Sequence, residues 1–130
     1  MKFIDTNVLV YFGEHESQKS GTAASVLTGG GVASVQVLNE LANVLRRKNK
    51  LAWDRIRPAL NLVRTLVDIV PLTVATHDGA LRLTVQYNFH FYDALIVASA
   101  LECGCDTLLT EDMHHGLLVE NRLTIVNPFA

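Results

Sequence analysis

The chain has 130 residues, of which 49% are hydrophobic, and its formal net charge at pH 7 is −2. This length suits one domain that buries about two-thirds of its unfolded surface, and the apolar content excludes a disordered chain. The slight acidity argues against a binding module that is basic all over, but less against a nuclease whose metal ions supply positive charge locally. We therefore expect residues 1–130 to form a single domain.

The sequence shows no sign of export or membrane insertion. Its opening residues, Met1–Asp5, lack the apolar segment of a signal peptide, and no apolar run approaches the ~20 residues of a membrane span. The two cysteines, Cys103 and Cys105, are too few for a four-ligand zinc site. We expect both to be reduced thiols in a cytoplasmic protein.

Short apolar runs alternate with longer amphipathic segments along the chain. In chain order, the pattern predicts a strand at Lys2–Ile4, helices at Thr6–Phe12 and Thr22–Thr28, a strand at Val32–Val35, helices at Gln36–Lys48 and Trp53–Leu66, a strand at Asp68–Leu72, helices at Val74–Tyr87 and Asp93–Leu101, and strands at Thr107–Leu109 and Leu123–Val126. The run Gly29–Gly31 is a flexible turn without the Lys-Ser/Thr of a phosphate-binding loop. This alternation predicts an α/β fold, a three-layer α/β/α sandwich with a central parallel sheet and right-handed crossovers.

Acidic residues follow the predicted strands, at the sheet edge where open α/β sheets bind their ligands. Asp5 directly follows the first strand, and Asp112 comes shortly after the fourth. Glu40 lies about one turn into the helix after the second strand, and Asp93 opens the helix that precedes the fourth. The order of elements therefore predicts that four carboxylates meet at one edge of one sheet.

Each acid also has a simpler structural explanation. Asp5 and Asp93 are placed where a helix N-cap is expected, and Glu40 borders the apolar side of its helix, where a solvated flank is common. Asp112 and Glu111 suit an exposed acidic turn, and for Glu111 we prefer that interpretation. Asp93 is the hardest to dismiss, because apolar residues flank it on both sides and an unpaired buried charge is costly.

Carboxylates that converge raise one another's pKa unless a cation neutralises them. Oxygen ligands with open positions favour Mg²⁺ or Mn²⁺ over zinc. Two such ions about 4 Å apart activate a water molecule and stabilise the leaving oxygen of a phosphodiester. Asp5, Glu40, Asp93 and Asp112 therefore predict a site for metal-assisted phosphodiester hydrolysis.

The sequence also resembles a known family, the PIN domain, and within it the VapC-type toxins of bacterial toxin–antitoxin pairs. The resemblance is carried by Phe3–Tyr11, Ser34–Glu40, Tyr92–Ala100 and Leu109–Met113, which occur in family order and at family-like spacing. It spans nearly the whole chain. It implies a PIN-like fold, a requirement for Mg²⁺ or Mn²⁺ and endonucleolytic cleavage of RNA.

The resemblance also assigns roles by position. It implies that Asp5, Glu40 and Asp93 are the core metal ligands, and that Asp112 is a fourth acid that supports a second ion or its bound water. Three small polar residues match family positions that hydrogen-bond the carboxylates or waters: Thr6, Asn7 and Thr110. The family further implies a homodimer and a protein antitoxin that blocks the acidic groove.

Basic residues near the end of the third predicted helix are candidates for an RNA approach. They are Arg46, Arg47, Lys48, Lys50, Arg55 and Arg57. A solvated helix end explains them equally well. His114 and His115 follow Asp112 and are either an exposed pair or substrate contacts, since imidazole is not a ligand that a magnesium site favours.

Two other functions compete with an endoribonuclease. A phosphatase-like α/β enzyme needs an aspartate nucleophile and a second aspartate two residues later, but that position is Asn7, and no lysine follows the fourth strand. The other is a PIN-like domain that binds a partner without cutting RNA. The complete set of acids argues against this non-catalytic alternative.

Overall fold

Strands and helices alternate along the chain, as the apolar pattern predicts. The structure is a computed structural model that describes residues 1–14 and 17–130. In chain order the elements are β1 (Lys2–Ile4), α1 (Thr6–Phe12), α2 (Gln18–Leu27), β2 (Val32–Ser34), α3 (Val35–Arg47), α4 (Trp53–Leu66), β3 (Asp68–Val70), α5 (Val74–Tyr87), α6 (Phe91–Glu102), β4 (Thr107–Leu109), β5 (Leu118–Val119) and β6 (Leu123–Val126).

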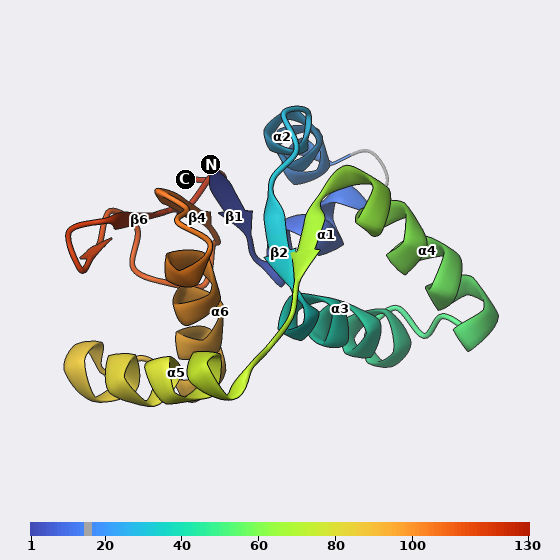
Figure 1. Cartoon of the computed structure of the whole chain (residues 1–130). Helices are drawn as coiled ribbons and strands as arrows, with labels where there is room; N and C mark the ends of the chain where they lie inside the picture. The colour runs from blue at the N-terminus through green and yellow to red at the C-terminus, as the bar shows by residue number, and fades with distance from the viewer. Residues whose placement is uncertain (15–16) are drawn as a thin grey trace.

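The described residues form a six-stranded sheet in the order β3-β2-β1-β4-β6-β5. All neighbouring strands are parallel except β5, which was not predicted and runs antiparallel to β6. The chain progresses outward from β1 to β3 and then returns to β4, so right-handed crossovers place α1–α4 on one face and α5–α6 on the other. Figure 1 shows these two helical layers, which confirm the predicted sandwich around a mixed, mostly parallel sheet.

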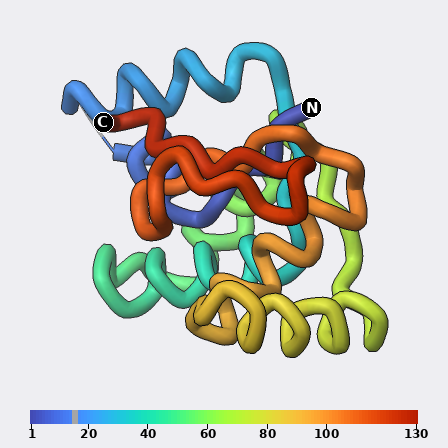
Figure 2. Tube along the Cα trace, turned by 90° about the vertical axis from the view of Figure 1, so that its left-hand side faces the viewer, coloured from blue at the N-terminus to red at the C-terminus, as the bar shows by residue number. Residues whose placement is uncertain are grey.

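Three helices start earlier than predicted, and α3 does so by one residue, at Val35 instead of Gln36. α2 begins about one turn early, at Gln18, because the Ser17 side chain accepts a hydrogen bond from the Ser20 main-chain N–H and Ser20 returns the bond in a capping box. α6 begins at Phe91 rather than at Asp93. Figure 2 shows α2 and α5 at opposite ends of the molecule, with the C-terminal strands between them.

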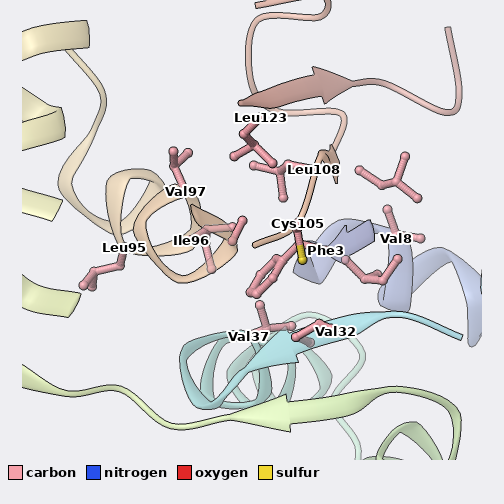
Figure 3. Packing of buried hydrophobic residues seen from close by; sticks show 14 of the residues in the cluster. Phe3, Val8, Val32, Val37, Leu95, Ile96, Val97, Cys105, Leu108 and Leu123 are labelled. Carbon is pink, nitrogen blue, oxygen red and sulfur yellow. The ribbon is translucent and has the colours of Figure 1, made fainter. Parts of the chain in front are cut away.

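The core includes the strands β1 and β4 and the helix α6. Phe3, Ile4 and Leu108 are fully buried, and α6 is buried continuously from Ala94 to Leu101 (Figure 3). Burial of each large apolar side chain contributes about 1.5–3 kcal/mol, so the centre of the sheet is firmly held. This packing fixes the carboxyl ends of β1 and β4. Across the described residues, no helix combines the length and apolarity needed to cross a lipid bilayer.

Candidate functional site

The carboxyl ends of β1 and β4 lie side by side at the point where the strand order reverses. Ile4 pairs with Leu109, and the main-chain N–H of Asp5 donates to the Leu109 carbonyl at 3.0 Å. Ligands of open α/β sheets bind at such a topological switch point. The residues that directly follow the two strands, Asp5 and Thr110, are therefore brought together.

Asp5 is a buried helix N-cap as well as a site residue. Its Oδ1 accepts from the Thr6 main-chain N–H at 2.7 Å, and its Oδ2 accepts from the Thr110 hydroxyl at 2.8 Å. Burial raises the pKa of Asp5 to about 7, although these two hydrogen bonds oppose the shift; the charges of Glu40 and Asp93 raise it further. A nearby cation would favour the charged carboxylate.

Glu40 reaches the same region from α3. That helix begins directly after β2 because the Ser34 side chain caps it, accepting from the Val37 main-chain N–H at 3.3 Å. The Glu40 carboxylate accepts from the Thr6 hydroxyl at 2.9 Å and from the Gln36 amide at 3.0 Å. Glu40 is therefore a half-buried, hydrogen-bonded side chain rather than a freely solvated flank.

Asp93 lies in the first turn of α6 and is half-buried. The N-cap of α6 is His90, so the interpretation of Asp93 as an N-cap is wrong. Burial raises the pKa of Asp93; His90 lowers it, and the charges of Asp112 and Glu40 raise it. Asp93 is therefore within electrostatic reach of Glu40 and Asp112, which come from other elements of the fold.

Asn7 connects the fourth acid to the rest. Its side-chain amide donates to the exposed Asp112 carboxylate at 3.0 Å and to the Thr110 hydroxyl at 3.1 Å. Each small polar residue singled out from the sequence therefore bonds an acid: Thr6 bonds Glu40, Asn7 bonds Asp112, and Thr110 bonds Asp5. These neutral donors hold the carboxylates together without cancelling their charge.

A pocket of about 460 Å³ opens beside Thr6, the residue that follows the buried Asp5. Glu40 and Asp112 line it together with Asn7, Tyr11 and Lys48. Within the described part of the chain, Lys48 is the only member of the predicted basic cluster that lines this pocket. The pocket therefore combines Glu40 and Asp112, two of the four predicted metal ligands, with the cationic side chain of Lys48.

The other basic residues have different surroundings. Arg46 donates to the Leu51 carbonyl at 3.1 Å and lies over the Trp53 ring, 5.4 Å from its centroid. Arg57 lines a separate cavity beside Trp53. His115 is exposed and accepts from the Asn127 main-chain N–H at 2.8 Å, which accounts for one residue of the histidine pair.

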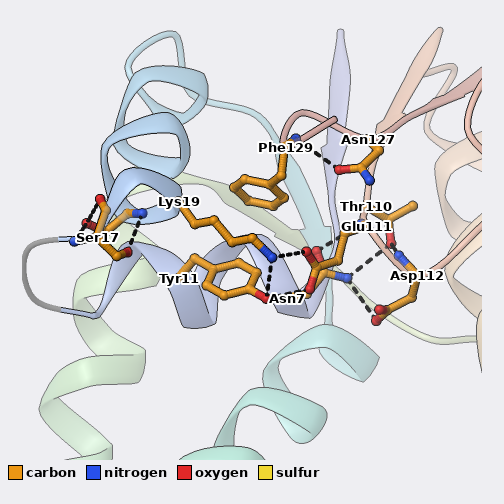
Figure 4. A network of polar contacts seen from close by, with 10 residues as sticks. Asn7, Tyr11, Ser17, Lys19, Thr110, Glu111, Asp112, Asn127 and Phe129 are labelled. Atoms are coloured by element: carbon orange, nitrogen blue, oxygen red, sulfur yellow. Dashed lines mark hydrogen bonds and ion pairs between the residues drawn. The ribbon is translucent and has the colours of Figure 1, made fainter.

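Glu111 corrects the prediction of an exposed acidic turn. Its side chain is 21% exposed and accepts hydrogen bonds from the Tyr11 hydroxyl at 2.5 Å and from Lys19 at 3.0 Å (Figure 4). Sequence reasoning missed Tyr11 and Lys19 because they lie about a hundred residues away from their partner. The one local indication was the spacing of Tyr11, one helical turn after Asn7, which puts both side chains on the same face of the helix.

The chemistry of the donor set fits a hard divalent cation. Asp5, Glu40, Asp93 and Asp112 supply oxygen only, and the ion pairs among the described residues involve other acids. In residues 1–14 and 17–130, no three His, Cys, Asp or Glu side chains lie close enough to hold one ion as they stand. The four acids therefore form an electrostatically coupled cluster rather than a finished coordination shell.

Fold and site together define an α/β protein with an acidic cluster at its topological switch point. The PIN domain profile matches residues 2–116, and the chain belongs to that family. This confirms the resemblance drawn from the sequence motifs.

Several solved structures with a fold similar to that of this chain are toxins or toxin–antitoxin complexes. VapC20 of Mycobacterium tuberculosis, a sarcin-ricin loop cleaving toxin, is 22% identical over 83% of this chain and 87% of its own, with a TM-score of 0.69. A toxin–antitoxin complex from Klebsiella pneumoniae is 18% identical over 99% and 98%, with a TM-score of 0.74. VapBC2 of Rickettsia felis, bound to a DNA fragment from its promoter, is 18% identical over 85% and 87%, with a TM-score of 0.64. No curated protein sequence matches the chain.

Proposed function

We propose that this protein is a metal-dependent endoribonuclease and the toxin of a type II toxin–antitoxin pair. The observation that carries the proposal is the convergence of acids at one switch point: neutral side chains hold Asp5, Glu40 and Asp112 there, and Asp93 is within reach of the charges of Glu40 and Asp112. Membership of the PIN family and the likeness in fold to VapC toxins support it.

The four acids would divide the work of holding Mg²⁺ or Mn²⁺. Asp5 and Asp93 would hold the principal ion, Glu40 would complete its shell or orient the attacking water, and Asp112 would support a second ion or the water on the other side. Such an ion supplies Lewis acidity and lowers the pKa of water. The protein's own contribution is to hold the carboxylates through Thr6, Asn7 and Thr110, since preorganised groups need not reorganise during reaction.

Cleavage of a structured RNA pool tests the proposal. We expect discrete cuts with Mg²⁺, no cuts with EDTA, and a loss of at least about a hundredfold in rate for Asp5→Asn. Asp54→Asn is the matched control, because it changes an exposed aspartate on α4 and should cut like the parent. If the parent leaves all RNA intact and shows no Mg²⁺ binding by calorimetry, the non-catalytic alternative replaces the nuclease.

Lys48 lines the pocket and is expected to contribute to RNA binding through a phosphate contact there. Lys48→Ala should weaken RNA affinity and reduce the slope of log K against log salt by about 0.7, the value for one phosphate of a single strand. Arg57→Ala removes an equal charge at a separate cavity and should leave the slope unchanged. A filter-binding titration at several salt concentrations measures both. Equal slopes for the parent and Lys48→Ala would remove this residue from the RNA interface.

A protein antitoxin is proposed to cover the acidic pocket. A groove of about 870 Å³ runs between α1, α3 and α4, and its lining is mostly apolar, including Leu9, Leu41 and Leu45. The groove adjoins the acidic pocket, because Val10 and Asn49 line both. An amphipathic helix fits such a groove. The proposal requires that the bound antitoxin abolish RNA cleavage, which the same RNA assay measures.

A homodimer is proposed on the exposed side of α5. Val74 and Val85 are 77% and 87% exposed, and Leu81 lies on the same face of the helix. Light scattering should give twice the chain mass of 14.3 kDa for the parent. Val85→Glu should give the single mass, because a charge on that face opposes apolar contact. A parent that is monomeric at all concentrations would contradict the dimer.

A further inference from the structure

We propose that Tyr11, Lys19 and Glu111 form a clamp that positions Asp112 at the acidic site. The inference rests on the proposed metal site and names positioning residues that the family resemblance does not supply. We call these three residues the Glu111 clamp. Its elements are α1, α2 and the segment that follows β4 (Figure 4).

Glu111 is held at three points. Its main-chain N–H donates to Asn7 Oδ1 at 3.2 Å, Tyr11 donates to Oε1 at 2.5 Å, and Lys19 donates to Oε2 at 3.0 Å. Lys19 also donates to the Tyr11 hydroxyl at 3.2 Å, which closes the triangle. A side chain bonded at both carboxylate oxygens and at its own main chain has little freedom to turn.

Aromatic contacts hold the two donors of the clamp in place. The Lys19 ammonium lies 4.7 Å from the centroid of the Tyr11 ring and 5.7 Å from that of Phe129. The Tyr11 and Phe129 rings meet edge to face, with centroids 4.9 Å apart. Such cation–π and edge-to-face contacts are favourable arrangements. The clamp therefore has a defined geometry of its own, independent of any ion.

The orientation of the Asp112 side chain depends on the neighbouring Glu111. Its side chain is exposed and accepts from Asn7 at 3.0 Å, and its main-chain N–H donates to the Thr110 hydroxyl at 3.2 Å. Glu111 sits between Thr110 and Asp112, so fixing Glu111 fixes the path of the chain that carries the Asp112 carboxylate. A shift of about 1 Å in a catalytic group can cost about a hundredfold in rate.

The clamp also keeps Glu111 from competing with Asp112. Both oxygens of Glu111 are engaged by donors, and the charge of Lys19 balances its carboxylate. The neighbouring Asp112 carries no such ion pair among the described residues. Of two adjacent acids, the clamp therefore leaves Asp112 as the one offered to a cation.

Mn²⁺ titration by calorimetry, on protein without RNA, tests the clamp. Asp112→Asn first identifies the binding phase that depends on Asp112. Tyr11→Phe and Lys19→Met should weaken Mn²⁺ binding in that same phase by roughly tenfold, the effect of losing a partner that orients a ligand. Lys19→Arg should restore most of the affinity, because a guanidinium can bond the same carboxylate. In RNA cleavage, the two disruptive variants should lower kcat and leave KM unchanged.

A second trio in the chain supplies matched controls. The Tyr87 hydroxyl accepts from the Glu120 main-chain N–H at 2.8 Å, and Arg82 pairs with the Glu120 side chain at 3.3 Å. Tyr87→Phe and Arg82→Met therefore remove the same kinds of group elsewhere on the protein. Both should lose some thermal stability while keeping the Mn²⁺ affinity of the parent.

The outcomes separate the clamp from the proposed nuclease. The clamp variants could have lower melting temperatures yet bind Mn²⁺ and cut RNA like the controls. That result would show that the trio only joins α1 and α2 to the segment after β4, and the inference would be wrong. A parent that shows the expected Mn²⁺ pattern yet cuts no RNA would overturn the nuclease and leave the clamp in place. A parent without an Asp112-dependent phase would overturn the clamp directly.

Discussion

Between about pH 4.5 and pH 8, without metal, the free energy of unfolding is expected to fall by roughly 3 kcal/mol more for the parent than for Asp5→Asn. The cause is the burial of Asp5, which raises its pKa from 3.8 to about 7 in the folded protein. In the unfolded chain the same group titrates near its ordinary value. The native state therefore holds a proton that the unfolded state has lost over most of this interval.

The direction follows from this difference in bound protons. Stability falls with rising pH wherever the native state binds more protons than the unfolded state. The contribution of Asp5 is fully present below about pH 4 and is lost as the pH rises through about 7. Asp93 acts in the same direction, because burial raises its pKa as well. The metal-free fold is thus expected to be weaker at neutral pH than in mild acid.

Urea unfolding at a series of pH values, in EDTA, measures the effect. Asp5→Asn keeps an oxygen for the Thr6 main-chain N–H and a polar partner for Thr110, while it removes the titrating group. Its unfolding free energy should vary much less with pH. Asp54→Asn, at an exposed position, should follow the parent. Identical pH profiles for the parent and Asp5→Asn would show that Asp5 titrates normally in the fold.

The apolar pattern predicted the sheet well because its central strands are buried on both faces. Phe3, Ile4, Leu108 and Leu109 form continuous apolar runs, and such runs have few alternatives in a chain of this size. β5 escaped prediction because it has only two residues and pairs with β6 across a turn in which Glu120 and Asn121 adopt positive φ. Neither residue is the glycine that usually marks such a turn.

The acids of the site were predictable for a different reason. Each follows a strand or lies within the first two turns of a helix, and the order of elements alone brings Asp5 and Asp112 to one edge. The role of Glu111 was not predictable, because it depends on how Tyr11 and Lys19 meet it across the fold. Local sequence gives a position along an element; it does not give a partner a hundred residues away.

Addition of Mg²⁺ should raise the free energy of unfolding by about 2.7 kcal/mol at a hundredfold excess over Kd, if the ion binds only the native state. The response should be larger at pH 8 than at pH 6. At pH 6, most Asp5 carboxyls carry a proton that the ion must displace, so the apparent affinity should be roughly tenfold weaker. Thermal unfolding with and without Mg²⁺, at both pH values, measures this.

Asp93→Asn separates ion binding from a general salt effect. Removing a half-buried charge that Asp112 and Glu40 oppose should stabilise the metal-free protein at pH 8 and remove most of the Mg²⁺ response. Asp78→Asn, an exposed change of equal charge on α5, should keep the response of the parent. If Asp93→Asn and the parent respond to Mg²⁺ equally, Asp93 is not a ligand. Asp93→Asn is therefore expected to raise the melting temperature without Mg²⁺ and to reduce the shift that Mg²⁺ produces. Both changes have one cause, because the negative charge of Asp93 repels the neighbouring acids in the metal-free fold and attracts the ion when it is present.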